Sequence, residues 1–299
     1  MPATSRLRTY SFVTALSLIA ASSSEAQTPS VTESYAPNGT PDQVMDIHWP
    51  TSRPTATVLF IHGGSLQQSG ERRDSPVYRN VCTQFVANGI ACATMDYRLA
   101  PANKWPAMPN DVALAVSHLR KLLAAGKGDP SKIFLFGHSS GCHLAAIVAT
   151  NGAYLQTVGL KTTDIAGIIP MGCILDRDDA TLRHLTPDAI RAQFMRDAED
   201  VATFGTPENY LAANPASFIG KHVPPTLVVV ADAERFMPPV MEQGARFVRL
   251  LLENDVPANM VVVPGTHMAS IAAVSKPGDP ALAAILHFIA DPRGSAAAH

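Results

Sequence analysis

The sequence lacks several features that whole classes of proteins depend on. It has no basic excess, since 23 Lys and Arg stand against 25 Asp and Glu in 299 residues, for a net charge of -2. Nucleic acids and anionic membranes attract basic surfaces, so we expect neither as a partner. Internal repeats, heptads, phosphate-binding glycine loops and metal-ligand spacings are also missing. We therefore expect no metal and no cofactor.

Long hydrophobic runs are scarce as well. The run Phe12–Ala21 is ten residues long, whereas a membrane-spanning helix needs about 20. Arg6 and Arg8 precede this run, and Ser24-Glu25-Ala26 follows it. This order is typical of a secretory signal peptide, and the alternative is a buried N-terminal helix. We predict a signal peptide at residues 1–26, no stable membrane anchor, and a secreted or periplasmic protein.

Cysteine is rare. The four cysteines are Cys82, Cys92, Cys142 and Cys173. An oxidising compartment would permit disulfides, and four cysteines allow three full pairings. A chain of this length can bury an adequate core without cross-links. The sequence therefore leaves buried free thiols at least as well supported as bridges.

Short apolar runs alternate with helical patterns through residues 27–299. Near-continuous apolar runs are typical of strands in a sheet that is covered on both faces. The runs are Val58–Ile61, Ile90–Met95, Ile133–Phe136, Ile168–Met171, Leu227–Val230 and Met260–Val263. Apolar residues at helical spacing occur at Val112, Val116, Leu119 and Leu123, and at Met241, Ala245, Val248 and Leu252. The alternation predicts a single α/β domain with a mostly parallel sheet.

One stretch, about residues 176–225, interrupts this alternation. It is rich in charge and in helix-forming residues. It is either a long decorated loop or a small helical cap. We favour the cap, because long insertions beside active sites often act as lids.

The strongest chemical motif is Gly137-His138-Ser139-Ser140-Gly141. An apolar run precedes it and a helical pattern follows it, which is the strand–turn–helix context of a nucleophile elbow. Glycines two residues on either side of the nucleophile make room for the tight turn. Ser140 lacks such flanks, because its corresponding neighbours are His138 and Cys142. We therefore predict Ser139 as the nucleophile.

An elbow requires an oxyanion hole. The backbone N–H of Ser140 is one predicted donor. Gly63, Gly64 and Ser65 directly follow the first apolar run and are the other candidates. Each donor lowers the barrier by about 3 kcal/mol. We interpret the preceding His62 as a residue that holds this loop.

The base and the acid should follow the nucleophile in the order acid, then His. His267 lies just past the last predicted strand, where an imidazole can reach the elbow. His222 precedes its strand and His287 lies in a terminal helix, so neither is a candidate. The fifth strand is followed by both Asp232 and Glu234. Spacing from the strand leaves both open as the acid.

These motifs together resemble the hormone-sensitive-lipase and carboxylesterase branch of the α/β hydrolases. Within it, the chain is similar to feruloyl and acetyl esterases and to arylformamidases. The resemblance rests on four segments: His62–Gly64, Asp96–Pro101, Gly137–Gly141 and Gly265–His267. It implies the α/β-hydrolase fold, with helices on both faces of the sheet and a small cap.

The resemblance also bears on the acid and the substrate. The family usually has Gly at the end of the acid's strand and the catalytic Asp three residues later. Ala231 and Glu234 occupy these positions here, which favours Glu234 over Asp232. Ser65 and Leu66 match neither the lipase-like nor the formamidase-like pattern.

We therefore predict a secreted serine esterase that acts through an acyl-enzyme without a cofactor. Its expected partner is a small-molecule ester, or an ester linked to a glycan or polymer. One alternative is an amidase or arylformamidase that uses the same triad. A further alternative is an inactive hydrolase fold that serves as a binding protein. Nothing in the sequence indicates an oligomeric state.

Overall fold

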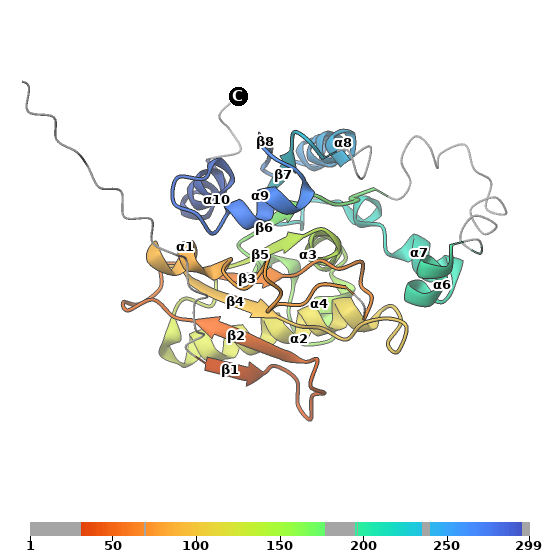
Figure 1. Cartoon of the computed structure of the whole chain (residues 1–299), viewed down its shortest axis with the longest axis horizontal. Helices are drawn as coiled ribbons and strands as arrows, with labels where there is room; N and C mark the ends of the chain where they lie inside the picture. Colours follow the sequence, from red (N-terminus) through yellow and green to blue (C-terminus); the bar gives the residue numbers. More distant parts are fainter. Residues whose placement is uncertain (1–30, 69, 177–194, 196, 235–239, 295–299) are drawn as a thin grey trace, which may run out of the picture.

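An eight-stranded sheet lies at the centre of the molecule, in the order β1-β2-β4-β3-β5-β6-β7-β8 (Figure 1). The computed structural model describes residues 31–68, 70–176, 195, 197–234 and 240–294. The strands are β1 (Val31–Ser34), β2 (Val44–His48), β3 (Thr57–Ile61), β4 (Ala91–Met95), β5 (Ile133–His138), β6 (Gly167–Met171), β7 (Thr226–Ala231) and β8 (Ala258–Val263). Pairings β1–β2 and β2–β4 are antiparallel, and the other five are parallel. The prediction of a mostly parallel sheet is confirmed.

All six predicted strands are present, as β3 to β8. Sequence reasoning missed β1 and β2. β2 alternates between buried and half-buried residues, and β1, at the edge of the sheet, between half-buried and exposed ones. A search for continuous apolar runs does not detect such alternation, which is typical of antiparallel strands with one wetter face.

Helices cover both faces of the sheet. They are α1 (Cys82–Ala87), α2 (Ala107–Leu122), α3 (Ser140–Thr150), α4 (Ala153–Gln156), α6 (Ala198–Phe204), α7 (Pro207–Ala212), α8 (Val240–Glu253), α9 (His267–Ala273) and α10 (Pro280–Ala290). Successive strand residues point to opposite faces. Leu59 and Ile61 of β3 pack with α2, α3 and α4, whereas Val58 and Phe60 pack with α1, α9 and α10. This two-sided burial explains the continuous apolar runs.

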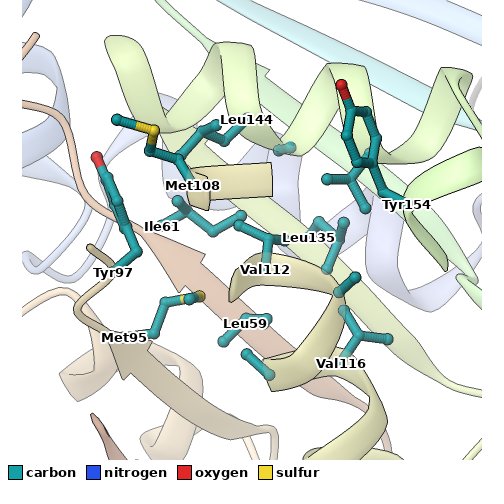
Figure 2. Close-up of a cluster of buried hydrophobic side chains, with 14 of the residues drawn as sticks. Leu59, Ile61, Met95, Tyr97, Met108, Val112, Val116, Leu135, Leu144 and Tyr154 are labelled. Atoms are coloured by element: carbon teal, nitrogen blue, oxygen red, sulfur yellow. The ribbon is translucent and has the colours of Figure 1, made fainter. Parts of the chain in front are cut away.

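The helical periodicity correctly predicted helices at α2 and α8 and marks the buried face of α2, whereas on α8 only Val248 of the four spaced residues packs against the core. Val112 and Val116 of α2 are buried against Leu59 and Leu135 (Figure 2). On α8, the predicted residues Met241 and Leu252 are exposed, and Ala245 with them. The core-facing residues of α8 are Val240, Gln243, Gly244, Phe247 and Leu251. Two apolar stripes run along this helix, and the stripe with the bulky Phe247 is the buried one.

The four cysteines form two disulfides, Cys82–Cys92 and Cys142–Cys173. The alternative of buried free thiols is therefore wrong. The fold brings the paired Cα atoms to 5.3 and 5.8 Å, within the range that a disulfide spans. The first bridge ties α1 to β4. The second ties the start of α3 to the loop that follows β6.

Part of the predicted insertion at 176–225 is described, and it contains α6 and α7, which lie to one side of the sheet in Figure 1. The remainder of the insertion, residues 177–194 and 196, lies outside the described residues, as does the predicted signal peptide. In the described ranges, no helix has the length and apolar character to cross a membrane.

Candidate active site

Ser139 lies in a sharp turn between β5 and α3. Its backbone has a φ of 54° and a ψ of -126°, a conformation that costs a non-glycine residue energy and that clusters at functional sites. The surroundings leave no room for larger neighbours. A Cβ on Gly137 would collide with the backbone of Gly141, and a Cβ on Gly141 would collide with the carbonyl oxygens of Ile61 and His62. The tight turn therefore depends on both glycines.

His267 and Glu234 are in direct contact. His267 is the first residue of α9, and its Nδ1 lies 2.5 Å from Oε1 of Glu234. Both side chains are buried, at 10% and 2% exposure. A Cβ on Gly172 would lie 2.8 Å from the Glu234 carboxylate and 3.2 Å from His267 Nδ1. The glycine after β6 therefore leaves space for this pair.

Asp232 lies elsewhere. Its residue is exposed, and its Oδ1 accepts a hydrogen bond from the backbone N–H of Gly265 at 2.9 Å. The Asp232 N–H donates to the Val263 carbonyl at the end of β8. Asp232 thus fastens the loop that leads to His267, and Glu234 is the carboxylate that contacts the imidazole.

The loop after β3 has an unusual backbone. Gly64, Ser65 and Leu66 have φ values of 107°, 57° and 63°, and the last two are uncommon for residues with a Cβ. The N–H of Gly63 donates to the hydroxyl of Tyr78 at 3.2 Å. Gly64 and Ser65 line the same cavity as Ser139 and Ser140.

A buried charge network supports the residue that begins this loop. His62 Nε2 lies 3.4 Å from Asp96 Oδ1. The His62 ring stacks on the ring of Tyr97, with the two centroids 4.4 Å apart. Arg73 forms an ion pair with Asp96. Burial alone would raise the pKa of Asp96, but the nearby His62 and a hydrogen bond from the Arg73 backbone N–H hold that pKa well below its usual range. His62 therefore contacts a carboxylate that stays ionised, as expected for a residue that holds the loop.

These segments surround a cavity of about 610 Å³. Its lining includes Ser139, Ser140 and His267, together with Gly64 and Ser65. Helices α6 and α7 of the insertion contribute Phe204 and Tyr210, and four carboxylates also line the cavity: Glu71, Asp197, Glu199 and Asp200. Among the lining residues that the structure describes, the acidic side chains are these four and none is Lys or Arg, so this part of the lining is acidic.

The Cys142–Cys173 disulfide joins two walls of the site. Cys142 lies three residues after Ser139, and Cys173 follows Gly172, beside the contact of His267 with Glu234. The bridge fixes the start of α3 to this loop.

Sequence reasoning missed several residues of the site. Tyr78 lies outside the motifs found in the sequence, and only the folded chain brings its hydroxyl to the N–H of Gly63. Asp96 belongs to the segment Asp96–Pro101 that carries the family resemblance, but its contact with His62 depends on how the strands pack. The lining residues of α6 belong to a stretch that carries no motif. Among the described residues, no group of three or more His, Cys, Asp or Glu side chains is arranged to hold a metal ion.

Comparison with known proteins finds a family match and several curated relatives. The model of the BD-FAE family matches residues 45–250. Esterase LipQ of Mycobacterium tuberculosis is 28% identical over 213 residues, covering 68% of this chain and 48% of LipQ. Esterase LipC of the same organism is 29% identical over 222 residues, covering 71% of this chain and 52% of LipC. The aligned region thus spans about half the length of these relatives.

Solved structures share the fold. A truncated carbohydrate esterase from gut microbiota superposes with a TM-score of 0.67 at 18% identity, covering 89% of this chain and 98% of that one. An esterase of the archaeon Pyrobaculum calidifontis gives a TM-score of 0.62 at 22% identity, covering 85% and 80%. At this identity the likeness shows the fold, which is the α/β-hydrolase fold implied by the sequence motifs.

Proposed function

The chain belongs to the BD-FAE family, in the hormone-sensitive-lipase-like carboxylesterase branch of the α/β hydrolases, and we propose that it hydrolyses carboxylic esters through Ser139. The observation that carries this proposal is one cavity lined by Ser139 and His267, with Glu234 2.5 Å from the far side of the imidazole. A nucleophile, a base and a carboxylate that orients the base are what acyl transfer requires.

In the proposed reaction, His267 takes the proton of Ser139 as the hydroxyl attacks the ester carbonyl. Glu234 stabilises the imidazolium that forms. Backbone N–H groups of Gly64, Ser65 and Ser140 hold the oxyanion. We leave Gly63 out of this set because its N–H already donates to Tyr78. The alcohol leaves with the proton from His267, and water then hydrolyses the acyl-enzyme by the reverse transfers.

We propose uncharged or cationic esters as substrates, because four carboxylates line the cavity and repel anions. We expect an aryl acetate to exceed the matched aryl succinate in kcat/KM by about tenfold or more at low salt. High salt should narrow this difference, since it screens charges near solvent. The measurement is initial rates on the two esters, and a preference for the succinate would contradict the charge argument.

The matched acetanilide tests the amidase alternative. Faster turnover of the anilide than of the aryl acetate would favour an amidase.

An acetylated or feruloylated carbohydrate belongs in the same panel, because one structural neighbour is named a carbohydrate esterase. We keep the glycan-linked ester as the narrower proposal. Turnover of acetylated xylan at a rate comparable to that of the aryl acetate would support it, and complete inertness toward the polymer would restrict the substrate to small molecules.

We also propose export through a signal peptide cleaved after Ala26. The two disulfides support this, because such bonds persist in oxidising compartments. N-terminal sequencing of protein produced with its leader in a bacterial host should begin at Gln27. A product that keeps residues 1–26 and remains in the cytoplasm would contradict export.

A further inference from the structure

Two buried side chains next to Ser139 have no part in the proposed reaction, and one of them, Tyr78, also borders the cavity. Tyr78 precedes α1, and His138 is the last residue of β5, directly before Ser139. They are 1% and 0% exposed. Their rings are neighbours, with centroids 5.7 Å apart. A buried hydroxyl and a buried imidazole are costly unless each of their polar atoms is paired.

A continuous chain of hydrogen bonds pairs them. The N–H of Gly63 contacts the hydroxyl of Tyr78 at 3.2 Å, and this hydroxyl lies 2.8 Å from Nδ1 of His138. Nε2 of His138 lies 3.0 Å from the backbone carbonyl oxygen of His267. The chain thus runs from the loop after β3, past the residue next to Ser139, to the start of α9.

Each bond in the chain has a single possible direction. The carbonyl oxygen of His267 can only accept, so Nε2 of His138 carries the proton. Burial and the nearby His267 lower the pKa of His138 to about 3, so the ring is neutral and its Nδ1 is an acceptor. Burial also raises the pKa of Tyr78, so its hydroxyl keeps the proton that it donates to Nδ1. The Tyr78 oxygen is then the acceptor for Gly63.

This direction has consequences for both ends of the chain. The Gly63 N–H is held toward Tyr78, which sets the peptide orientation just before Gly64 and Ser65. At the other end, the backbone of His267 is held where its side chain meets Glu234. A misplacement of about 1 Å costs about 100-fold in rate when reacting groups must be aligned.

We propose that Tyr78 and His138 are positioning residues that fix the oxyanion loop and the base relative to each other. This inference rests on the proposed function. Neither side chain exchanges a proton in the reaction, and neither is proposed to touch the substrate's reacting atoms. Their contribution is to hold two loops, far apart in the sequence, in one arrangement around Ser139.

The test compares Tyr78→Phe, which removes one oxygen and keeps the ring, with His138→Asn, which keeps an acceptor but has no donor near the His267 carbonyl. We expect each to lower kcat on an aryl acetate by about 10- to 100-fold, with KM within about threefold. The double variant should lose little more kcat than the more damaging of the two single variants, because both changes break the same hydrogen-bond chain. The matched control is Tyr154→Phe, which removes a buried hydroxyl that interacts with Trp105, with kcat expected within about twofold of wild type.

The thermal midpoint of each variant separates positioning from folding. A kcat of Tyr78→Phe within twofold of wild type would overturn the inference, as would a double variant whose loss equals the product of the two single losses. An equal loss of kcat in Tyr154→Phe would also overturn it. These failures are distinct from failure of the proposed function, which would show as activity that survives Ser139→Ala.

Discussion

Replacing Ser139 with Ala should lower kcat on an aryl acetate by about 10⁴-fold or more, because the change removes the oxygen that is proposed to form the acyl-enzyme. The change removes only the hydroxyl oxygen and leaves the packing of the turn unchanged, so the thermal midpoint of unfolding should stay close to that of the wild type. The neighbouring Ser140 should not substitute, since its Oγ is buried and it begins α3. Steady-state rates and the unfolding midpoint of the same preparation check this.

A matched control is Ser117→Ala on α2, where the serine lines a different cavity. Its activity should remain near that of wild type. A fluorophosphonate probe should label wild type and Ser117→Ala, and leave Ser139→Ala unlabelled. Residual activity of Ser139→Ala within tenfold of wild type would rule out the proposed mechanism. A folded wild-type protein that the probe does not label would instead favour a hydrolase fold that only binds its ligand.

The second large effect should come from Glu234→Gln, with a loss in kcat of about 10³- to 10⁴-fold. The amide keeps the size of the side chain but removes the charge beside Nδ1 of His267, 2.5 Å away. The imidazolium formed during the reaction then lacks its counter-charge, and the amide can hold the wrong tautomer. KM should change little, because Glu234 is not among the residues that line the cavity.

Asp232→Asn is the matched comparison, because it makes the same chemical change two residues away. Asp232 accepts a backbone hydrogen bond from Gly265, which an Asn oxygen can also accept. We expect kcat within about tenfold of wild type. If Asp232→Asn proved the more damaging of the two changes, the assignment of Glu234 as the acid would be wrong.

The elbow was readable from the sequence because its constraint is local. A turn this tight requires glycine at positions 137 and 141, since added Cβ atoms would meet backbone atoms. The strands were readable for a similar reason: residues buried on both faces leave continuous apolar runs. β1 and β2 escaped detection because one-sided burial leaves a weaker pattern.

Relations between distant segments depended on the fold. Asp232 and Glu234 follow the same strand at almost the same distance, and only the packing of the loops after β6, β7 and β8 directs one to His267 and the other to Gly265. The cysteine pairs likewise depended on which strands and helices became neighbours. On α8, apolar residues lie on more than one face, and contact with the sheet decided that the face with Phe247 is buried.

Glycine spacing and apolar runs were thus sufficient for the parallel strands β3 to β8, the tight turn at Ser139 and the family resemblance, because steric and hydrophobic demands act on nearby residues. The pairing of His267 with Glu234, the Gly63–Tyr78–His138–His267 chain and the carboxylate-lined cavity were set by tertiary structure. These arrangements form between residues that are far apart in sequence, where no local pattern records which groups will meet.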